Sequence, residues 1–112
     1  MRVISVNTNG IRAASRKGFF DWLKTQEADF VCIQETKAQV NQLEDPMFHP
    51  EGYVSHYCDA LKKGYSGTAI YSLHQPLQVI RGFGESEFGE AEIGGFRYFS
   101  CVRLLVSENE GV

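Results

Sequence analysis

Short apolar runs and one helix-spaced apolar stripe follow each other along the first third of the chain. Residues 3–6 form a β-prone run that ends in the turn formers of residues 7–10. From Gly18 the apolar residues follow helical spacing, which predicts an amphipathic helix of about two turns. Residues 29–33, which are apolar from Phe30 onwards and are closed by polar residues, form a run of the kind found in strands buried on both faces.

Strand, helix and strand in this order form a βαβ unit, whose crossover makes the two strands parallel. The carboxyl ends of parallel strands share one edge of a sheet, and open α/β sheets commonly bind ligands there. Asn7 follows the first strand, while Gln34 and Glu35 follow the second. We therefore expect these polar residues to converge at one edge.

The remaining pattern predicts further strands and no second domain. Residues 40–45 favour a helical turn before Pro46. Residues 53–58 and 67–72 are predicted to form two antiparallel strands, and residues 77–80 a further strand. No internal repeat or linker interrupts this order, so the sequence indicates a single α/β unit.

Several aromatic, histidine and cysteine residues indicate structural roles. The aromatic residues of the predicted helix are expected in the core, not as a base-stacking platform, because helical spacing already explains them. The histidines lie in no HxH or HExxH motif, and the cysteines lack a CxxC pair, which argues against structural zinc or a disulfide framework. These residues are Phe19, Phe20 and Trp22; His49, His56 and His74; and Cys32, Cys58 and Cys101.

Composition describes a soluble globular domain of 112 residues, 43% hydrophobic and 22% charged. No run approaches the roughly 18 to 20 apolar residues of a membrane-spanning helix, so we expect a cytoplasmic location without membrane contact. The net charge of −3 excludes a protein whose whole surface binds polyanions without selectivity. Residues 1–66 carry eight basic and eight acidic side chains, whereas residues 67–112 carry three and six. Contact with nucleic acid would be local and would lie in the first part.

Asn7 and Glu35 are the candidate metal ligands. A carboxylate is a hard oxygen donor suited to Mg²⁺, which uses one or two protein carboxylates while a substrate phosphate and waters supply other oxygens. The amide of Asn7 could orient Glu35, a metal-bound water or a phosphate. Taken alone, both residues are better explained by ordinary structure: Glu35 as a solvated strand end, and Asn7, Asn9 and Gly10 as a turn.

Arg12 and the segment Lys62-Lys63-Gly64-Tyr65-Ser66-Gly67 are the candidate contacts to a nucleic-acid backbone. The segment combines two cations, two glycines, a hydroxyl and an aromatic ring, which suits phosphate contact without base readout. Alternatively, it is a solvated loop whose glycines set the turn, and Arg12 is an ordinary surface cation. The residues themselves favour neither interpretation.

The blocks NTNGIRA, IQETK and KKGYSG together closely resemble exodeoxyribonuclease III and related apurinic/apyrimidinic endonucleases over roughly residues 1–88. The resemblance implies part of a deoxyribonuclease I-like sandwich, in which two mixed β-sheets pack face to face with helices outside. It implies that Glu35 binds Mg²⁺ (or Mn²⁺) directly and that Asn7 belongs to the same metal centre. It also implies hydrolysis of double-stranded DNA at abasic sites and 3′ ends, with Arg12, Lys62, Lys63, Tyr65 and Ser66 contacting the backbone.

Residues 89–112 depart from this pattern and are expected to be a divergent tail. Complete family members are much longer, and the family's further catalytic Tyr, Asp, Asn and His residues fall outside the matched blocks. A shift of reading frame near Phe88 is one hypothesis for the tail. A truncated sandwich exposes apolar faces, so we expect poor solubility or self-association, weak Mg²⁺ binding and no detectable catalysis by this chain.

Three functions therefore remain open. The first is a DNA-repair nuclease, favoured by Asn7, Glu35 and KKGYSG. The second is a non-catalytic remnant, favoured by the missing carboxyl-terminal residues. The third is a phosphatase of the same superfamily, against which the KKGYSG and NGIRA blocks argue.

Overall fold

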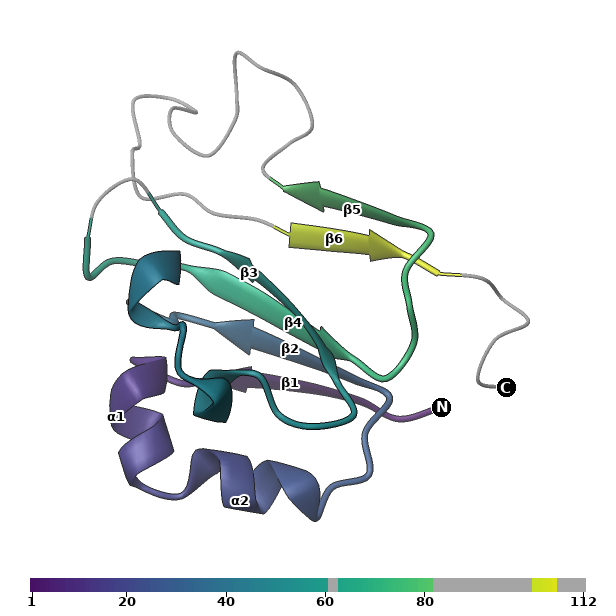
Figure 1. The fold of residues 1–112 in the computed structure, drawn as a ribbon, viewed down its shortest axis with the longest axis horizontal. Helices are drawn as coiled ribbons and strands as arrows, with labels where there is room; N and C mark the ends of the chain where they lie inside the picture. Colours follow the sequence, from purple (N-terminus) through teal and green to yellow (C-terminus); the bar gives the residue numbers. More distant parts are fainter. Residues whose placement is uncertain (61–62, 82–101, 107–112) are drawn as a thin grey trace.

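A four-stranded mixed sheet organises the part of the chain that the structure describes (Figure 1). The structure is a computed structural model that describes residues 1–60, 63–81 and 102–106. The order in the main sheet is β1-β2-β4-β3, and a separate ribbon joins β5 and β6. The strands are β1 (Val3–Asn7), β2 (Phe30–Gln34), β3 (Val54–Cys58), β4 (Thr68–Ser72), β5 (Gln78–Arg81) and β6 (Val102–Leu105).

The predicted strand pairing is confirmed. β1 and β2 are parallel, with Val3 opposite Phe30 and Asn7 opposite Gln34. β4 is antiparallel to both β2 and β3, as expected for the pair at residues 53–58 and 67–72. The carboxyl ends of β1 and β2 therefore lie next to the amino end of β4, where Thr68 is opposite Gln34.

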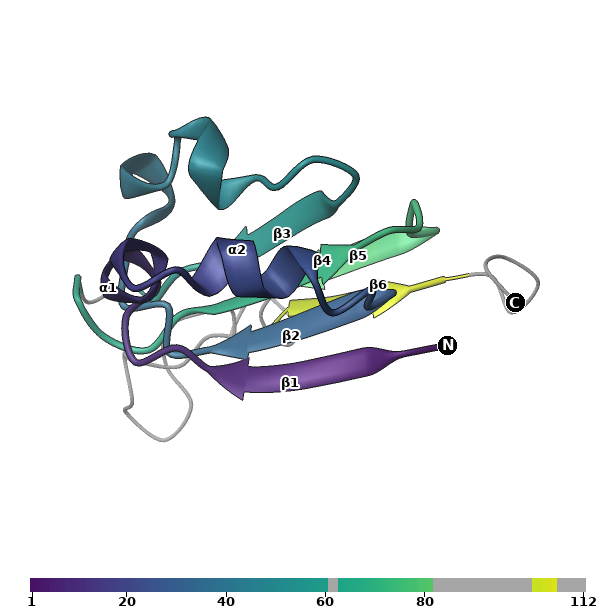
Figure 2. The ribbon, with the colours of Figure 1, turned by 90° about the horizontal axis from the view of Figure 1, so that it is seen from below.

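Two short α-helices and two 3₁₀ turns cover one face of the main sheet (Figure 2). These elements are α1 (Ile11–Arg16), α2 (Phe19–Lys24), η1 (Val40–Gln42) and η2 (Pro46–Phe48). The predicted helix is α2, and η1 lies in the predicted turn at residues 40–45. The sequence pattern missed α1 because Ile11 is its sole buried residue, which is too little for a helical period.

The hydrophobic core lies between these helices and the sheet. Alternate strand residues point into it, as the period of a strand requires. Its buried members include Ile11, Phe20, Leu23, Val31, Ile33, Leu43, Phe48, Tyr57 and Tyr71.

The opposite face of the sheet is only partly covered. Within β2, Val31 and Ile33 are buried, whereas Phe30 and Cys32 are half-buried. The prediction that this strand is buried on both faces is therefore wrong for the described residues. An apolar groove of about 230 Å³ on this face includes Val3, Phe30, Ile70 and Leu104 among its lining residues. It lies between β6 and the main sheet, so the ribbon covers only part of this face.

Trp22 is not a core residue, contrary to the prediction from helical spacing. Its side chain is 43% exposed, while Phe20 beside it is 8% exposed. Helical spacing placed Trp22 on the apolar stripe of α2, but in this six-residue helix only Phe20 and Leu23 are buried.

Other sequence expectations have mixed outcomes. Among the described residues, Cys32 and Cys58 form no disulfide, and no helix is long and apolar enough to span a membrane. The predicted strand at residues 77–80 is β5. Within the proposed tail, the structure describes residues 102–106, which include β6 paired with β5. Residues 89–101 and 107–112 lie outside the described residues, and the boundary at residue 88 stays a prediction.

Candidate functional site

The ends of β1 and β2 form the floor of the candidate site. Asn7 pairs with Gln34 at the end of the parallel ladder between β1 and β2. Glu35 is the residue that follows this pair. Hydrogen bonds continue past the strands: the Thr8 N–H donates to the Gln34 carbonyl at 3.0 Å, and the Gly10 N–H donates to the Glu35 carbonyl at 2.8 Å. The structure thus brings the backbones of Asn7 and Glu35 to one edge.

A third loop, which precedes β4, joins the same edge. The Thr36 N–H donates to the Gly67 carbonyl at 3.0 Å, and the Lys37 N–H donates to the Ser66 carbonyl at 2.7 Å. The end of the KKGYSG segment is thereby attached to the two residues that follow Glu35. Segments that the sequence analysis selected separately meet here.

Unusual backbone conformations concentrate at this edge. Four non-glycine residues have positive φ: Asn9 (46°), Glu35 (54°), Lys37 (52°) and Ser66 (49°). Such values are rare for residues with a β-carbon and persist where surrounding contacts enforce them. Elsewhere in the described chain, Glu27 is the one non-glycine residue of this kind. The hydrogen bonds between the three loops supply the required constraint.

Side-chain contacts give Asn7 a structural role as well. Asn7 is exposed, and its Oδ1 accepts a hydrogen bond from the Asn9 N–H at 2.9 Å. The interpretation of residues 7–10 as a turn is therefore supported. An amide oxygen has two lone pairs, so this bond leaves capacity for a second partner. The Asn9 Oδ1 in turn accepts a hydrogen bond from the Lys37 Nζ.

The predicted DNA-contacting residues are placed as follows. Arg12 is exposed in α1, next to Ile11, whose N–H donates to the Thr36 carbonyl at 2.9 Å. Lys63 and Tyr65 are exposed, and Ser66 is half-buried. Lys62 lies outside the described residues. Backbone hydrogen bonds thus attach Ser66, and Ile11 next to Arg12, to the loop that follows Glu35.

Lys37 and Thr36 escaped the sequence analysis as site residues. Both belong to the IQETK block, but their relevance comes from contacts with Asn9 and Gly67. Neither contact has a signature in residue spacing. The positive φ of Lys37 is likewise not encoded by a glycine or asparagine.

The donor atoms available at this edge fit part of a magnesium site. Glu35 is half-buried and supplies a carboxylate, while Asn7 supplies an amide oxygen, and both are hard oxygen donors. Among the described residues, no three His, Cys, Asp or Glu side chains gather closely enough to hold a metal. The pair thus matches a Mg²⁺ ion that keeps several waters and takes further oxygens from substrate or other protein residues.

The fold is an α/β scaffold that gathers polar residues at the ends of two parallel strands, and comparison with known proteins assigns the family. Residues 4–103 match the Endonuclease/Exonuclease/phosphatase family, and the chain belongs to that family. An exodeoxyribonuclease of Bacillus subtilis (strain 168) is 49% identical over 88 residues, which cover 78% of this chain and 34% of that relative. An apurinic or apyrimidinic site endonuclease of Dictyostelium discoideum is 31% identical over 84 residues, 75% of this chain and 23% of that protein.

Solved structures agree with this assignment. An AP endonuclease from Archaeoglobus fulgidus superimposes with a TM-score of 0.66 and 32% identity, over 80% of this chain and 34% of that one. The predicted fold class is thereby confirmed as a mixed sheet with flanking helices that matches AP endonuclease structures. The chain spans about a third of the length of these relatives.

Proposed function

We propose that this chain supplies the Asn7–Glu35 half of a divalent-metal centre in a DNA-repair nuclease that hydrolyses phosphodiester bonds. The observation that carries the proposal is the hydrogen-bonded junction of the three loops, which fixes Asn7, Glu35 and Ser66 at one edge. The relatives named as an exodeoxyribonuclease and an AP endonuclease support DNA as the substrate. We take abasic sites and 3′ ends of duplex DNA as the targets.

In this proposal, Glu35 and Asn7 would hold Mg²⁺ (or Mn²⁺). The metal, when bound, stabilises the negative charge that develops on the phosphate and the leaving oxygen. The Lys37 Nζ donates a hydrogen bond to the side-chain Oδ1 of Asn9. The backbone N–H of Asn9 in turn donates to the Asn7 Oδ1. This chain of bonds orients the amide of Asn7 at the edge. Arg12, Lys62, Lys63, Tyr65 and Ser66 would contact the sugar-phosphate backbone.

Residues outside this chain's described part would complete catalysis. Relatives are about three times as long as the matched segment, and the described residues contain no three-residue metal cluster. We therefore propose that the 112-residue chain binds Mg²⁺ weakly and does not turn over DNA. The non-catalytic remnant remains the second candidate, and the same observation favours it.

Metal-dependent stabilisation tests the proposed role of Glu35. The midpoint of thermal unfolding is measured with and without Mg²⁺ for the wild-type chain, Glu35→Gln and the exposed control Glu51→Gln. A ligand that binds only the folded state raises the midpoint. We expect a rise for wild type and Glu51→Gln, and a smaller rise or none for Glu35→Gln. Equal shifts in all three would remove Glu35 from the metal centre.

An incision assay tests the proposal of inactivity. The purified chain is incubated with abasic duplex and Mg²⁺, and we expect no multiple-turnover cleavage. Cleavage that Glu35→Ala abolishes would show that the chain is a complete catalyst and would overturn this part of the proposal.

A further inference from the structure

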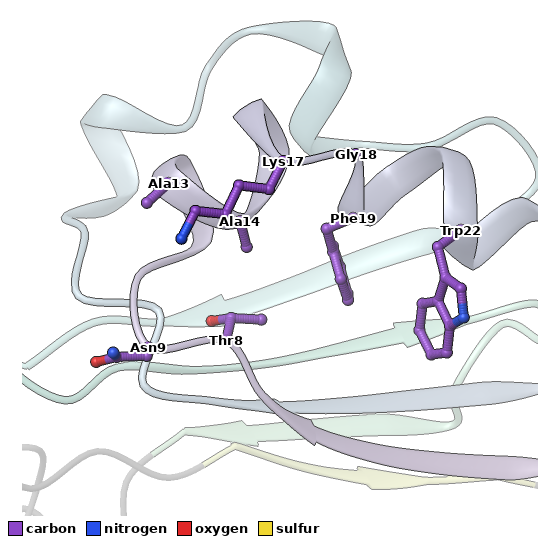
Figure 3. Close-up of a pocket in the computed structure, with 8 residues that line it drawn as sticks. All are labelled: Thr8, Asn9, Ala13, Ala14, Lys17, Gly18, Phe19 and Trp22. Carbon is purple, nitrogen blue, oxygen red and sulfur yellow. The ribbon is translucent and has the colours of Figure 1, made fainter.

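A pocket of about 320 Å³ opens between the end of β1 and α2, directly beside the candidate metal edge (Figure 3). Figure 3 shows Phe19 and Trp22 descending from α2 towards the sheet, with Thr8 opposite them at the end of β1 and Lys17 above. The size lies at the lower end of the range for small-ligand sites. Its lining includes Thr8, Asn9, Lys17, Gly18, Phe19 and Trp22.

The aromatic wall of this pocket is anchored in the core. Phe20, 8% exposed, contacts Phe19 edge-on with ring centroids 5.1 Å apart. Phe19 in turn supports Trp22, with ring centroids 5.9 Å apart and an interplanar angle of 35°. Trp22 is 43% exposed despite this support. A large ring that is held from behind and open to solvent is suited to stacking against a flat ligand.

The charge around the pocket suits an anionic ligand. Residues 11–24 carry four basic side chains and one acidic side chain, although the whole chain has a net charge of −3. Lys17 is exposed and lines the pocket itself. A cation beside an exposed aromatic ring is the combination with which proteins bind single-stranded nucleic acid: the cation meets the phosphate and the ring meets the base.

The pocket is also connected to the candidate metal edge through the chain. Thr8 and Asn9, which line it, follow Asn7 directly in the chain. Asn9 joins the two places, because its N–H donates to the Asn7 Oδ1 and its own Oδ1 accepts from the Lys37 Nζ.

We propose that this pocket binds an unpaired nucleotide of a DNA strand, with the base stacked on Trp22 and a phosphate held by Lys17. The choice of DNA as the ligand rests on the proposed function, whereas the binding itself requires no metal. Every base presents a π-face, so this contact is tolerant of sequence. The pocket would select unpaired nucleotides over those within a duplex, because the faces of a base inside a duplex are already stacked on its neighbours.

Trp22 is the single tryptophan of the chain, so its fluorescence reports on this pocket alone. The full chain is titrated with oligothymidylate of about ten nucleotides, in EDTA so that no metal contributes. We expect saturable quenching. A matched oligomer of abasic sugar-phosphate units carries the same charge without bases and is expected to quench and bind less. Equal binding of the two oligomers, or no quenching by either, would overturn the proposal.

Variants locate the contact by the anisotropy of a labelled oligothymidylate. Trp22→Ala is expected to weaken binding roughly five- to hundredfold, whereas Trp22→Phe retains most of the affinity. Lys17→Gln is expected to reduce the salt dependence of binding. The matched control is Lys24→Gln, which lines a different pocket and is expected to have a smaller effect on that dependence. Circular dichroism verifies folding, and unchanged affinity in folded Trp22→Ala contradicts the proposal.

Glu35→Gln separates this inference from the proposed function. Loss of Mg²⁺ stabilisation in Glu35→Gln without any effect of Trp22→Ala would reject the pocket and keep the metal centre. The reverse result would reject the metal centre and keep the pocket.

Discussion

A β-carbon on Gly67 would lie 2.1 Å from the Thr36 Oγ1, closer than any two such atoms can approach. Thr36 is 2% exposed, so its side chain has little room to withdraw. Gly67 also has a φ of +85°, which residues with a β-carbon rarely adopt. The absence of a β-carbon at Gly67 thus allows the loop before β4 to lie directly against Thr36, the residue that follows Glu35.

Gly67→Ala is therefore expected to destabilise the chain by about 2–4 kcal/mol, the sum of backbone strain and steric overlap. Urea unfolding followed by circular dichroism measures this loss. Gly64→Ala is the matched control, because Gly64 also has positive φ (+77°) but a β-carbon there would meet nothing within 4 Å. We expect about 1 kcal/mol for the control. Equal losses at the two glycines would contradict a role for the Thr36 contact.

The two buried tyrosines beneath the helices are expected to respond unequally to loss of their hydroxyls. The Tyr57 hydroxyl donates to the Phe48 carbonyl at 2.7 Å and is also hydrogen-bonded to the Tyr71 hydroxyl. Since the Tyr57 hydroxyl has one proton, Tyr71 donates to it. Tyr57→Phe leaves the Phe48 carbonyl and the Tyr71 hydroxyl without this partner, so we expect a loss of about 2–4 kcal/mol, against about 1 kcal/mol for Tyr71→Phe.

Equilibrium unfolding in urea of both variants measures this difference. A double variant completes the cycle and isolates the interaction of the two hydroxyls. A larger loss for Tyr71→Phe than for Tyr57→Phe would contradict the central role of the Tyr57 hydroxyl in this pair of bonds.

The sequence predicted that the ends of β1 and β2 meet at one edge because that meeting follows from topology. The order strand, helix, strand fixes parallel pairing of β1 and β2, and this pairing brings Asn7 beside Gln34 whatever the loops do. The remaining contacts depend on the exact paths of the loops. The attachment of Ser66 to Lys37 joins residues that are far apart in the chain, and no periodicity marks it.

Trp22 shows the limit of periodicity more sharply. Helical spacing indicates which side of α2 is apolar, but not whether the sheet extends far enough beneath it. In the structure the core covers Phe20 and Leu23 of α2 but leaves Trp22 43% exposed. Exposure of this ring is thus a property of tertiary arrangement, and its functional interpretation became available only with the structure.

Acid is expected to loosen the edge of the sheet opposite the candidate site through Asp29. The Arg2 backbone N–H donates to the Asp29 Oδ2 at 2.8 Å, and the His74 Nε2 lies 3.0 Å from the Oδ1. The Arg2 hydrogen bond first, and His74 second, lower the pKa of Asp29 below its ordinary value of 3.8. A lowered carboxyl pKa contributes stability above about pH 3.8, and this contribution disappears as the pH falls through the lowered pKa.

Urea midpoints measured from neutral pH down to the acid limit test this contribution. Asp29→Asn is expected to be less stable than wild type at neutral pH and to lose less stability below the ordinary carboxyl pKa. The exposed Asp21→Asn is the control and is expected to follow wild type. Parallel pH profiles for wild type and Asp29→Asn would contradict this role of Asp29.

His56 is expected to weaken the fold in a higher pH window. Its side chain is 7% exposed, and its Nε2 has no hydrogen-bond partner among the residues that the structure describes. Burial first, and then the Arg81 guanidinium, lower the pKa of His56 below its ordinary value of 6.5. The folded chain thus keeps this imidazole neutral where the unfolded chain binds a proton, so stability falls as the pH decreases through 6.5 towards the lowered pKa.

His56→Leu is expected to remove this decline, because leucine fills the space without titrating. Unfolding midpoints are compared between about pH 7.5 and 5.5, on either side of the ordinary histidine pKa. The control is His49→Gln, since His49 is an exposed residue whose Nε2 lies 2.7 Å from the Leu43 carbonyl. A decline that persists in His56→Leu would assign the pH dependence to another group. A decline that disappears there but persists in His49→Gln would establish His56 as its source.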